Sequence, residues 1–309
     1  MRNIFIKELI KESRNDKDIF LITGDLGFRC FEVFKKEFPD RFINVGVSEN
    51  NMIGLSAGMA LQGKKIFVYS ILSFLVFRCF EQIRNNICHN NLNVKLIGGG
   101  GGFSYAEQGI SHNTTEDLSI MRSLPNMSVF NPGSRFEAEL AIKTVFKMSS
   151  PSFVRLGKVP NIEYYKKKPN YKAGDGLLIQ NGKDLTIFSS GNITEVAVEV
   201  ANKLKSHDIH AKVISIICLK PLNKESVISH ISSKYVITIE EHSEIGGLGS
   251  AIADILCEKT LNNILLKKIA LKDKCHTEIG SQKFLRKLNG LDSNQIVLKI
   301  IDLIKNEYQ

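Results

Sequence analysis

The sequence contains no apolar run that approaches the ~20 residues a membrane-spanning helix requires. Its longer apolar stretches, such as Tyr235–Ile239, have the length of β-strands. The first residues, Met1–Glu8, include charged side chains and no uninterrupted apolar segment, so we expect no signal peptide. These absences predict a cytoplasmic protein without a membrane segment.

Paired cysteines are also missing. No two are spaced as C-x-x-C, which argues against a disulfide framework or a zinc site. We expect no metal site in this chain and mostly buried, reduced thiols at the six positions Cys30, Cys79, Cys88, Cys218, Cys257 and Cys275.

A concentrated basic patch is absent, although the net charge is +9. Lysines are scattered along predicted helix faces with Glu and Asp between them, and the densest run is Lys166–Lys168. Proteins that bind nucleic acid usually concentrate their charge in a patch. We expect a solvated basic surface and no nucleic-acid partner. Nucleic-acid binding stays an alternative that rests on charge alone, with a steep salt dependence as its signature.

The chain does contain a regular alternation of strand and helix patterns over 309 residues. One alternation ends near Ser152–Arg155, and a second one ends in a helix at Ser293–Asn306. Such alternation predicts mostly parallel sheets with helices on both faces. We expect two consecutive three-layer α/β domains, at residues 1–157 and 184–309, with a linker rich in Pro and Gly at 158–183.

Two segments of the first domain carry groups suited to ligand binding. Glu49 opens a helix after a strand and stands among small and apolar residues; taken alone, it fits a first-turn carboxylate favoured by the helix dipole. Phe74, Phe77 and Phe80 recur every three residues in a predicted helix, Phe74–Cys88. Such a stripe either belongs to the core or forms a wall on which a flat heteroaromatic ring stacks.

A third segment begins with five glycines, Gly98–Gly102, at the end of a predicted strand. The polar loop that follows carries His112 towards the next helix. A histidine at the carboxyl end of a parallel strand is well placed for acid–base chemistry. The segment has no G-x-x-x-x-G-K-S/T pattern and is therefore not a phosphate-binding P-loop.

In order and spacing, the three segments resemble the pyrimidine-binding domain of the transketolase family, whose enzymes use thiamine diphosphate (ThDP). The family's G-(V/I)-x-E-x-x-M motif is matched at Gly46–Met52, its F-x-x-F-x-x-Y/F helix at Phe74–Phe80, and its G-x-(S/T)-H loop at Gly109–His112. The run Ile120–Pro132 is also typical of the family, and Glu240–Ala251 is similar to a motif of its C-terminal domain. The resemblance covers nearly the whole chain.

The resemblance implies a role for each matched residue. The carboxyl of Glu49 would bond N1′ of the aminopyrimidine from an apolar setting that raises its pKa, and the ring would stack on Phe77. The implied catalytic residues are Glu49 and His112. The implied cofactor-binding residues are Glu49, Phe77, Phe74, Phe80, Val47 and Asp25.

The substrate residues depart from the family pattern. Gln108 stands where the family usually has Asp, and Gly100 falls on a family His that helps to bind sugar phosphate. The family's phosphate-binding Arg is matched loosely by Arg155. The resemblance thus implies substrate contacts from His112, Gln108 and Arg155, without defining which ketose or aldehyde is used.

The diphosphate-binding half of a complete transketolase has no counterpart here. Gly174-Asp-Gly176 and Asn202 imitate its metal motif, but the first lies in the predicted linker and the second in a predicted helix, so we reject the pair. The resemblance therefore implies one half of a split transketolase. ThDP would be shared with a separate chain that carries Gly-Asp-Gly…Asn and binds Mg²⁺, in a heterotetramer built on a dimer of this chain.

The resulting hypothesis is the catalytic pyrimidine-binding subunit of a ThDP-dependent ketol transferase of carbohydrate metabolism, active only with its partner. Within the same fold, a 1-deoxyxylulose-5-phosphate synthase-like carboligase and a 2-oxo-acid dehydrogenase β subunit remain alternatives. A non-catalytic scaffold is the alternative from a different class. The joint presence of Glu49, the phenylalanine stripe and His112 argues against it.

Overall fold

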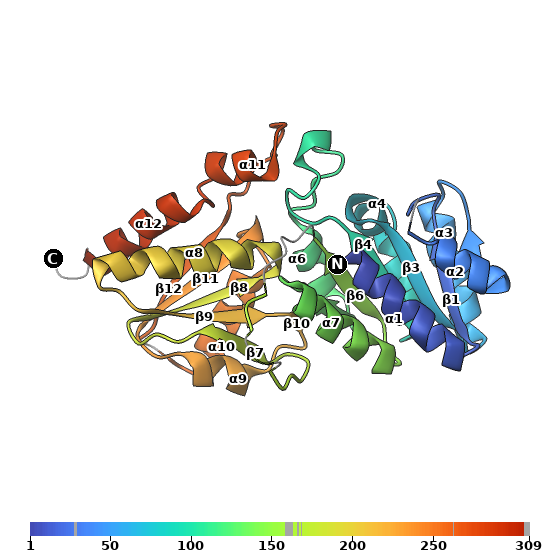
Figure 1. Cartoon of the computed structure of the whole chain (residues 1–309), viewed down its shortest axis with the longest axis horizontal. Coiled ribbons are helices and arrows are strands. Elements are labelled where there is room, and N and C mark those ends of the chain that lie inside the picture. The colour runs from blue at the N-terminus through green and yellow to red at the C-terminus, as the bar shows by residue number, and fades with distance from the viewer. Residues whose placement is uncertain (28–29, 158–162, 166, 168, 262, 306–309) are drawn as a thin grey trace.

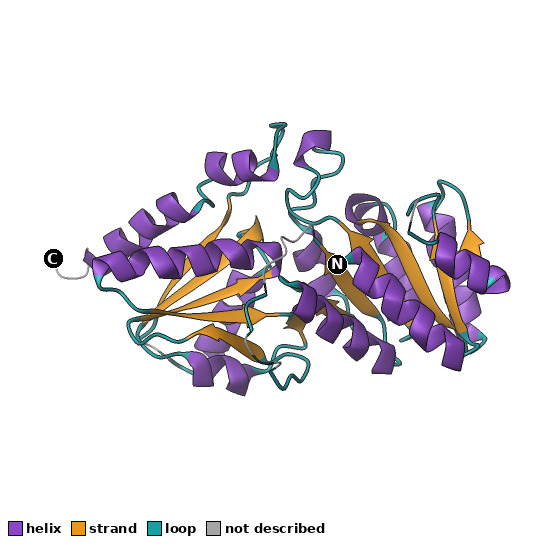
Figure 2. Ribbon diagram, in the orientation of Figure 1, coloured by secondary structure: helices purple, strands orange, loops and turns teal. Residues whose placement is uncertain are grey.

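The computed structural model describes residues 1–27, 30–157, 163–165, 167, 169–261 and 263–305. The chain forms two sheets that lie side by side along the long axis of the molecule, with helices packed on them (Figures 1 and 2). The predicted α/β class with mostly parallel strands is confirmed.

The first sheet has seven strands in the order β10-β5-β6-β4-β3-β1-β2. Six come from the first half of the chain and run parallel to their neighbours: β1 (Ile19–Thr23), β2 (Phe42–Asn44), β3 (Lys65–Ile71), β4 (Val94–Gly99), β5 (Ser128–Phe130) and β6 (Ser152–Leu156). The seventh, β10 (Cys218–Lys220), comes from the second half and pairs antiparallel with β5. The sequence analysis did not predict this strand, because three residues give no periodicity.

Alternate side chains of the central strands face opposite layers, as expected for strands. On β3, Ile66 and Val68 belong to one core cluster, whereas Phe67 and Tyr69 belong to another. Figure 1 shows α1 and α7 side by side on the second of these faces. The helices of this half are α1 (Arg2–Asn15), α2 (Glu32–Glu37), α3 (Glu49–Leu61), α4 (Leu72–Phe77), α5 (Phe80–Gln82), α6 (Asp117–Ser123) and α7 (Arg135–Lys147), with short 3-10 turns at Pro39–Arg41 (η1) and Ala106–Gln108 (η3).

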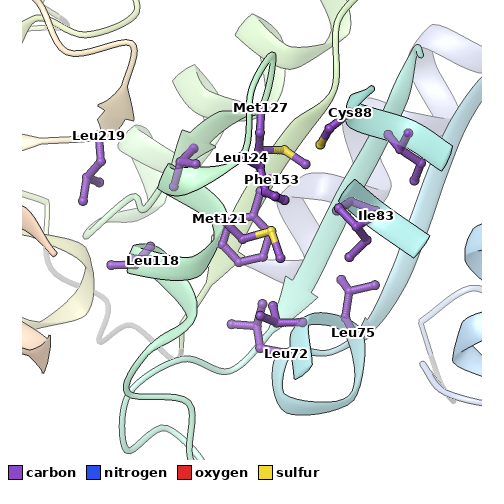
Figure 3. Packing of buried hydrophobic residues seen from close by; sticks show 14 of the residues in the cluster. Leu72, Leu75, Ile83, Cys88, Leu118, Met121, Leu124, Met127, Phe153 and Leu219 are labelled. Carbon is purple, nitrogen blue, oxygen red and sulfur yellow. The ribbon is translucent and has the colours of Figure 1, made fainter. Parts of the chain in front are cut away.

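The helix expected over Phe74–Cys88 is wrong as one continuous element. The chain forms α4, breaks at Arg78 and Cys79, resumes as α5, and continues as a π-helix, η2 (Ile83–Cys88). Figure 3 shows why the pieces stay together: Leu72, Leu75 and Ile83 point into the same apolar cluster as Met121 of α6. Burial of these side chains fixes each piece against the sheet. The break divides the phenylalanine stripe, with Phe74 and Phe77 on α4 and Phe80 on α5.

The second sheet has five strands in the order β12-β11-β8-β9-β7. They are β7 (Gly176–Gln180), β8 (Leu185–Ser190), β9 (Ala211–Ile216), β11 (Tyr235–Ser243) and β12 (Leu265–Leu271), and all pairings are parallel except that of β7 with β9. Its helices are α8 (Thr194–Leu204), α9 (Lys224–His230), α10 (Leu248–Glu258), α11 (Gln282–Leu288) and α12 (Ser293–Lys305), with 3-10 turns at Gly191–Ile193 (η4) and Lys205–His207 (η5).

The predicted linker, 158–183, is wrong at its end, because residues 176–180 form the edge strand β7. Lys158 and its neighbours to residue 162 lie outside the described residues. Tyr165 anchors the connection: its hydroxyl donates to a carboxylate oxygen of the buried Glu137 at 2.5 Å. The domain boundaries themselves stay a prediction.

Gly174-Asp-Gly176 and Asn202, which resemble a metal motif in the sequence, lie on different elements with different partners. Asp175 precedes β7, where its carboxylate accepts a hydrogen bond from the amide of Asn223 at 2.7 Å. Asn202 lies on α8 and accepts from Lys205. The six cysteines are free, and three of them, Cys79, Cys88 and Cys218, are buried. None of the helices in the described ranges has the length and apolar character to span a membrane.

Candidate functional site

Glu49 occupies the first position of α3, separated by four residues from the carboxyl end of β2, which is Asn44. A turn at Gly46, whose φ of +71° suits glycine, joins the strand to the helix. The Glu49 side chain is 4% exposed and its Oε2 accepts from the guanidinium of Arg78 at 3.2 Å. The structure thus pairs this carboxylate with a cation that the sequence analysis did not assign. The signal was present, since Arg78 is the charged residue inside the phenylalanine stripe.

Arg78 links Glu49 to the other predicted site residues. Its guanidinium carbon lies 4.0 Å from the centroid of the Phe74 ring, a cation–π contact. The Phe74 ring in turn meets the His112 imidazole edge-on, with ring centroids 5.1 Å apart. Glu49, Arg78, Phe74 and His112 therefore form one continuous row, although they come from three segments of the sequence. We call these four residues the site row.

The other two phenylalanines take different places. Phe77, the last residue of α4, is 42% exposed and offers a ring face to solvent. Phe80 lies beyond the helix break, on α5, and packs against the core. The break at Arg78 and Cys79 thus places Phe80 on a different helix from Phe74 and Phe77, and its assignment to the cofactor stays a prediction.

His112 sits in a loop that is closed at its base. Gly102 and Thr114 exchange backbone hydrogen bonds of 2.7 and 3.2 Å, which form a small antiparallel bridge. Inside the loop, Nδ1 of His112 lies 3.0 Å from the hydroxyl of Ser111, and the Tyr105 ring stands 6.3 Å from the imidazole centroid. The imidazole is partly exposed, so it can meet a ligand.

Three further predicted residues lie around the row. Gln108 is exposed at the end of η3, in the same loop as His112. Val47, 76% exposed, precedes Glu49 by two residues. Asp25 follows β1, exchanging hydrogen bonds with Asn44 through its N–H at 2.8 Å and its carboxylate at 3.1 Å. All three stand at or beyond carboxyl ends of parallel strands, where ligands of such sheets bind.

Arg155 does not fit its predicted substrate role. Only 3% of the residue is exposed, and its Nε lies 2.9 Å from the carboxylate of the buried Asp117. Its Nη2 donates to the carbonyls of Thr114 at 2.9 Å and Glu241 at 3.3 Å. The guanidinium is therefore held within the protein and offers no surface to a phosphate. This burial argues against a substrate contact by Arg155.

Tyr105 also lines a basic cavity of about 620 Å³. Arg2 from α1 and Arg135 from α7 line it, together with Tyr69, Tyr105 and the backbone at Gly100. Its described lining residues include no carboxylate. Burial raises the pKa of Tyr69 to about 12, so this phenol stays neutral beside Arg2. The sequence analysis did not predict this cavity, because Arg2 and Arg135 belong to α1 and α7. These helices pack on the face of the sheet opposite to α3 and α4, which carry the predicted site residues.

The motif at Glu240–Ala251 builds the junction between the two sheets. The Glu240 carboxylate accepts from the N–H groups of Leu248 and Gly249 at the start of α10, at 2.7 and 2.8 Å. Burial raises the pKa of Glu240 to about 7. His242 accepts at Nε2 from the N–H of Ser119 at 3.2 Å, and burial lowers its pKa to about 3. This motif is structural in its contacts, and it touches the segment that follows His112.

The groups of the site row and its neighbour Phe77 match the chemistry of the pyrimidine ring of ThDP. An aminopyrimidine needs an acceptor at its polar edge and an aromatic face on which to stack. Glu49 supplies a nearly buried carboxylate, and Phe74 and Phe77 supply partly exposed rings on the neighbouring α4. The donor set fits the ring. Among the described residues there is no cluster of His, Cys, Asp and Glu suited to a metal ion.

The sequence matches two family models. Residues 1–160 match the model described as the transketolase pyrimidine binding domain, and residues 174–296 match the transketolase C-terminal domain. A protein of Methanocaldococcus jannaschii described as a putative transketolase C-terminal section is 34% identical over 310 residues, covering 99% of this chain and 97% of its own. One of the subunits of the apulose-4-phosphate transketolase of Actinobacillus succinogenes is 30% identical, and the match covers 96% of each chain.

A solved structure shares the fold. It is described as a split gene transketolase in an inactive beta4 tetramer, and superposes with a TM-score of 0.84 at 34% identity. The match covers 96% of this chain and 95% of the other.

Proposed function

This chain belongs to the transketolase family, and from that premise we propose that it is the catalytic pyrimidine-binding subunit of a split ThDP-dependent transketolase. It would transfer a ketol unit from a ketose to an aldehyde acceptor. The observation that carries the proposal is the site row, which gathers a nearly buried carboxylate, an aromatic face and an imidazole at the carboxyl ends of the first sheet.

Each residue of the row has a task in this proposal. ThDP supplies a carbanion-type nucleophile and an electron sink when it is bound. Glu49 holds the pyrimidine edge through its carboxylate, while Arg78 fixes the position of that carboxylate. The exposed Phe77 holds the ring face, and Phe74 lies beside it with the Arg78 guanidinium over its own ring. His112 moves the proton of a substrate hydroxyl through its imidazole, a transfer in which a positioned histidine is worth about 10²–10⁴-fold.

The partner in this proposal is a separate chain that holds the diphosphate and Mg²⁺. The structurally similar split transketolase is described as inactive in a beta4 assembly, which supports the need for another chain. Apolar side chains near the row are exposed on this chain, among them Val47, Leu55 and Ile110. A Cβ at Gly54 or Gly58 of α3 would meet no atom within 4 Å, so this face is open to another backbone. We propose a heterotetramer with a dimer of this chain as its core.

We also propose that the substrate carries an anionic group. Arg2 and Arg135 line the basic cavity together with Tyr105, whose ring centroid lies 6.3 Å from that of His112. Arginine suits phosphate because its planar fork of donors matches the oxygens. The name of the Actinobacillus succinogenes relative includes a phosphorylated sugar, which supports this class of substrate. Arg135→Gln should raise KM at least ~10-fold for a ketose phosphate and leave KM for the unphosphorylated ketose within about 2-fold.

The proposed function is tested with the reconstituted pair of chains. Ketose phosphates, unphosphorylated ketoses and pyruvate are offered against one aldehyde acceptor. Ketol transfer from a ketose supports the proposal. Turnover of pyruvate alone would replace it by a decarboxylating carboligase of the 1-deoxyxylulose-5-phosphate synthase or 2-oxo-acid dehydrogenase type. Absence of turnover on every donor, with the cofactor bound, would favour a scaffold.

A further inference from the structure

We infer that Glu241, from the domain of the second sheet, positions His112 by holding the base of its loop. The inference rests on the acid–base role proposed for His112. It gives the C-terminal domain of this chain a task in the reaction, although none of its residues belongs to the site row.

The base of the loop lies directly on the Glu241 carboxylate. Oε1 accepts the backbone N–H of Phe103 at 2.7 Å, one residue after the bridge between Gly102 and Thr114. A Cβ at Gly102 would lie 2.2 Å from this same oxygen, and its φ is +56°. Only glycine allows the carboxylate to approach so closely. The glycine run therefore makes room for Glu241.

The other side of the base, at Thr114 and Thr115, is held by Arg155 of β6 and by β11, the strand that carries Glu241. Arg155 donates both to the carbonyl of Thr114 and to that of Glu241, at 2.9 and 3.3 Å. The N–H of Ser243, two residues further along β11, donates to the carbonyl of Thr115 at 2.7 Å. His112 lies two residues before Thr114. Its backbone is thus bracketed by two points of attachment to the second sheet's domain.

Glu241 is itself fixed by α11. It is 1% exposed; its Oε2 pairs with Nε of Arg286, and its Oε1 accepts from the amide of Gln282 at 2.8 Å. Arg286 is held in turn by Glu195 of α8 at 2.6 Å. These buried contacts leave the carboxylate little freedom, since each of its oxygens has defined donors.

The loop and the C-terminal domain also share apolar contacts. The buried Phe103 ring meets His276 edge-on at 5.4 Å, and a Cβ at Gly109 would contact Ile279 at 3.4 Å. In Figure 1 the loop with η3, drawn in teal-green, reaches towards α11. These contacts keep the loop near the domain, whereas Glu241 supplies the directional hydrogen bond that sets its base.

The test compares Glu241→Gln with Glu240→Gln in the reconstituted holoenzyme. Glu240 is the matched control: it is equally buried and adjacent, but its carboxylate bonds α10 and not the loop. In Glu241→Gln one of the two acceptor oxygens becomes an NH₂ donor, which then faces either Arg286 or the donors at Phe103 and Gln282, so the loop base shifts. Displacement of a catalytic group by about 1 Å costs up to ~10²-fold. We expect kcat to fall about 10- to 100-fold with KM within 2-fold, and exchange at the cofactor's C2, assigned to Glu49, to stay unchanged.

Hydrogen–deuterium exchange of the amides in residues 103–114 reads the loop without any turnover. It should rise at least ~10-fold in Glu241→Gln and stay near wild type in Glu240→Gln. In a His112→Ala background, Glu241→Gln should reduce kcat no further, because it acts through that imidazole. If Glu241→Gln does not fold, Gln282→Ala takes its place, with the same pattern at smaller amplitude.

Unchanged loop exchange, or a loss of kcat that persists in the His112→Ala background, would overturn the inference. Full turnover of His112→Ala alone would instead remove the proposed role of His112, and the exchange arm would still decide whether Glu241 holds the loop.

Discussion

The variant Arg155→Met distinguishes between a structural role of Arg155 and a role in substrate binding. The substitution keeps most of the apolar volume but removes the ion pair with Asp117 and the donors to two carbonyl groups. Both side chains of the pair are buried, at 4% and 0% exposure. Removing one partner of a buried ion pair costs about 3–5 kcal/mol, because the other charge stays behind without compensation. We expect a loss of that size in the free energy of unfolding, measured with urea.

The pH dependence of this loss has a defined sign. Burial raises the pKa of Asp117 to about 6, although Arg155 opposes the shift. Without Arg155 the folded-state pKa rises further above the unfolded value, so the charged carboxylate destabilises the fold as pH increases. The loss should therefore be larger at pH 8 than at pH 5. The double variant Asp117→Asn, Arg155→Met should recover part of the stability, since no buried charge remains.

Steady-state kinetics of Arg155→Met test the alternative, a contact between Arg155 and the substrate phosphate. With Arg155 inside the protein, KM for a ketose phosphate and for its unphosphorylated form should change by the same small factor. A loss of stability below about 1 kcal/mol, combined with a raised KM for the phosphorylated donor only, would refute the structural reading. It would return Arg155 to the substrate site.

Three further predictions follow from the site and the junction. Glu49→Gln should slow proton–deuterium exchange at C2 of ThDP at least ~10³-fold in the reconstituted complex, which is ~4 kcal/mol at 1.36 kcal/mol per decade; wild-type exchange would remove Glu49 from the proposal. His112→Ala should lower kcat on every donor, whereas Gln108→Asp should change the ranking of donors, because an amide both donates and accepts while a carboxylate only accepts; equal rankings would contradict this. Burial lowers the pKa of His242 to about 3 from its usual 6.5, so the stability linked to its neutral form is complete above pH 6.5 and is lost as pH falls towards 3. In thermal unfolding, the Tm of wild type should therefore fall more steeply with decreasing pH than the Tm of His242→Gln. Asp117 and Glu240 contribute with the opposite sign, but both proteins contain them, so their contributions cancel in the comparison. Equal slopes of Tm against pH would refute the prediction.

The sequence predicted the α/β fold and most of its elements because long buried strands and amphipathic helices carry strong periodic signals. The helix predicted over Ser293–Asn306 is α12, which the structure describes over Ser293–Lys305. The predictions failed where tertiary contacts decide. β7 and β10 are short edge strands, and the break after Phe77 is set by packing of Cys79 and Ile83 into the core.

The sequence predicted the motif residues of the site but not the residues that link them in space. Glu49, Phe74 and His112 were identified together and lie in one row. The residues that connect them are set by spatial neighbours, so Arg78, Tyr105 and the arginines of the basic cavity were not assigned. Arg155 failed for the same reason, because its buried partner Asp117 and the carbonyl of Glu241 come from other segments.

The central claim is that this chain holds half of a shared cofactor site. Calorimetric titration of ThDP with Mg²⁺ tests it most directly, first on this chain alone and then on its mixture with the chain that carries the diphosphate motif. We predict no tight binding and no ketol transfer for the chain alone, because the proposal assigns the charge-assisted contacts to the diphosphate to the partner chain. We predict binding with turnover once the two are mixed. Micromolar binding of ThDP by this chain alone would contradict the account.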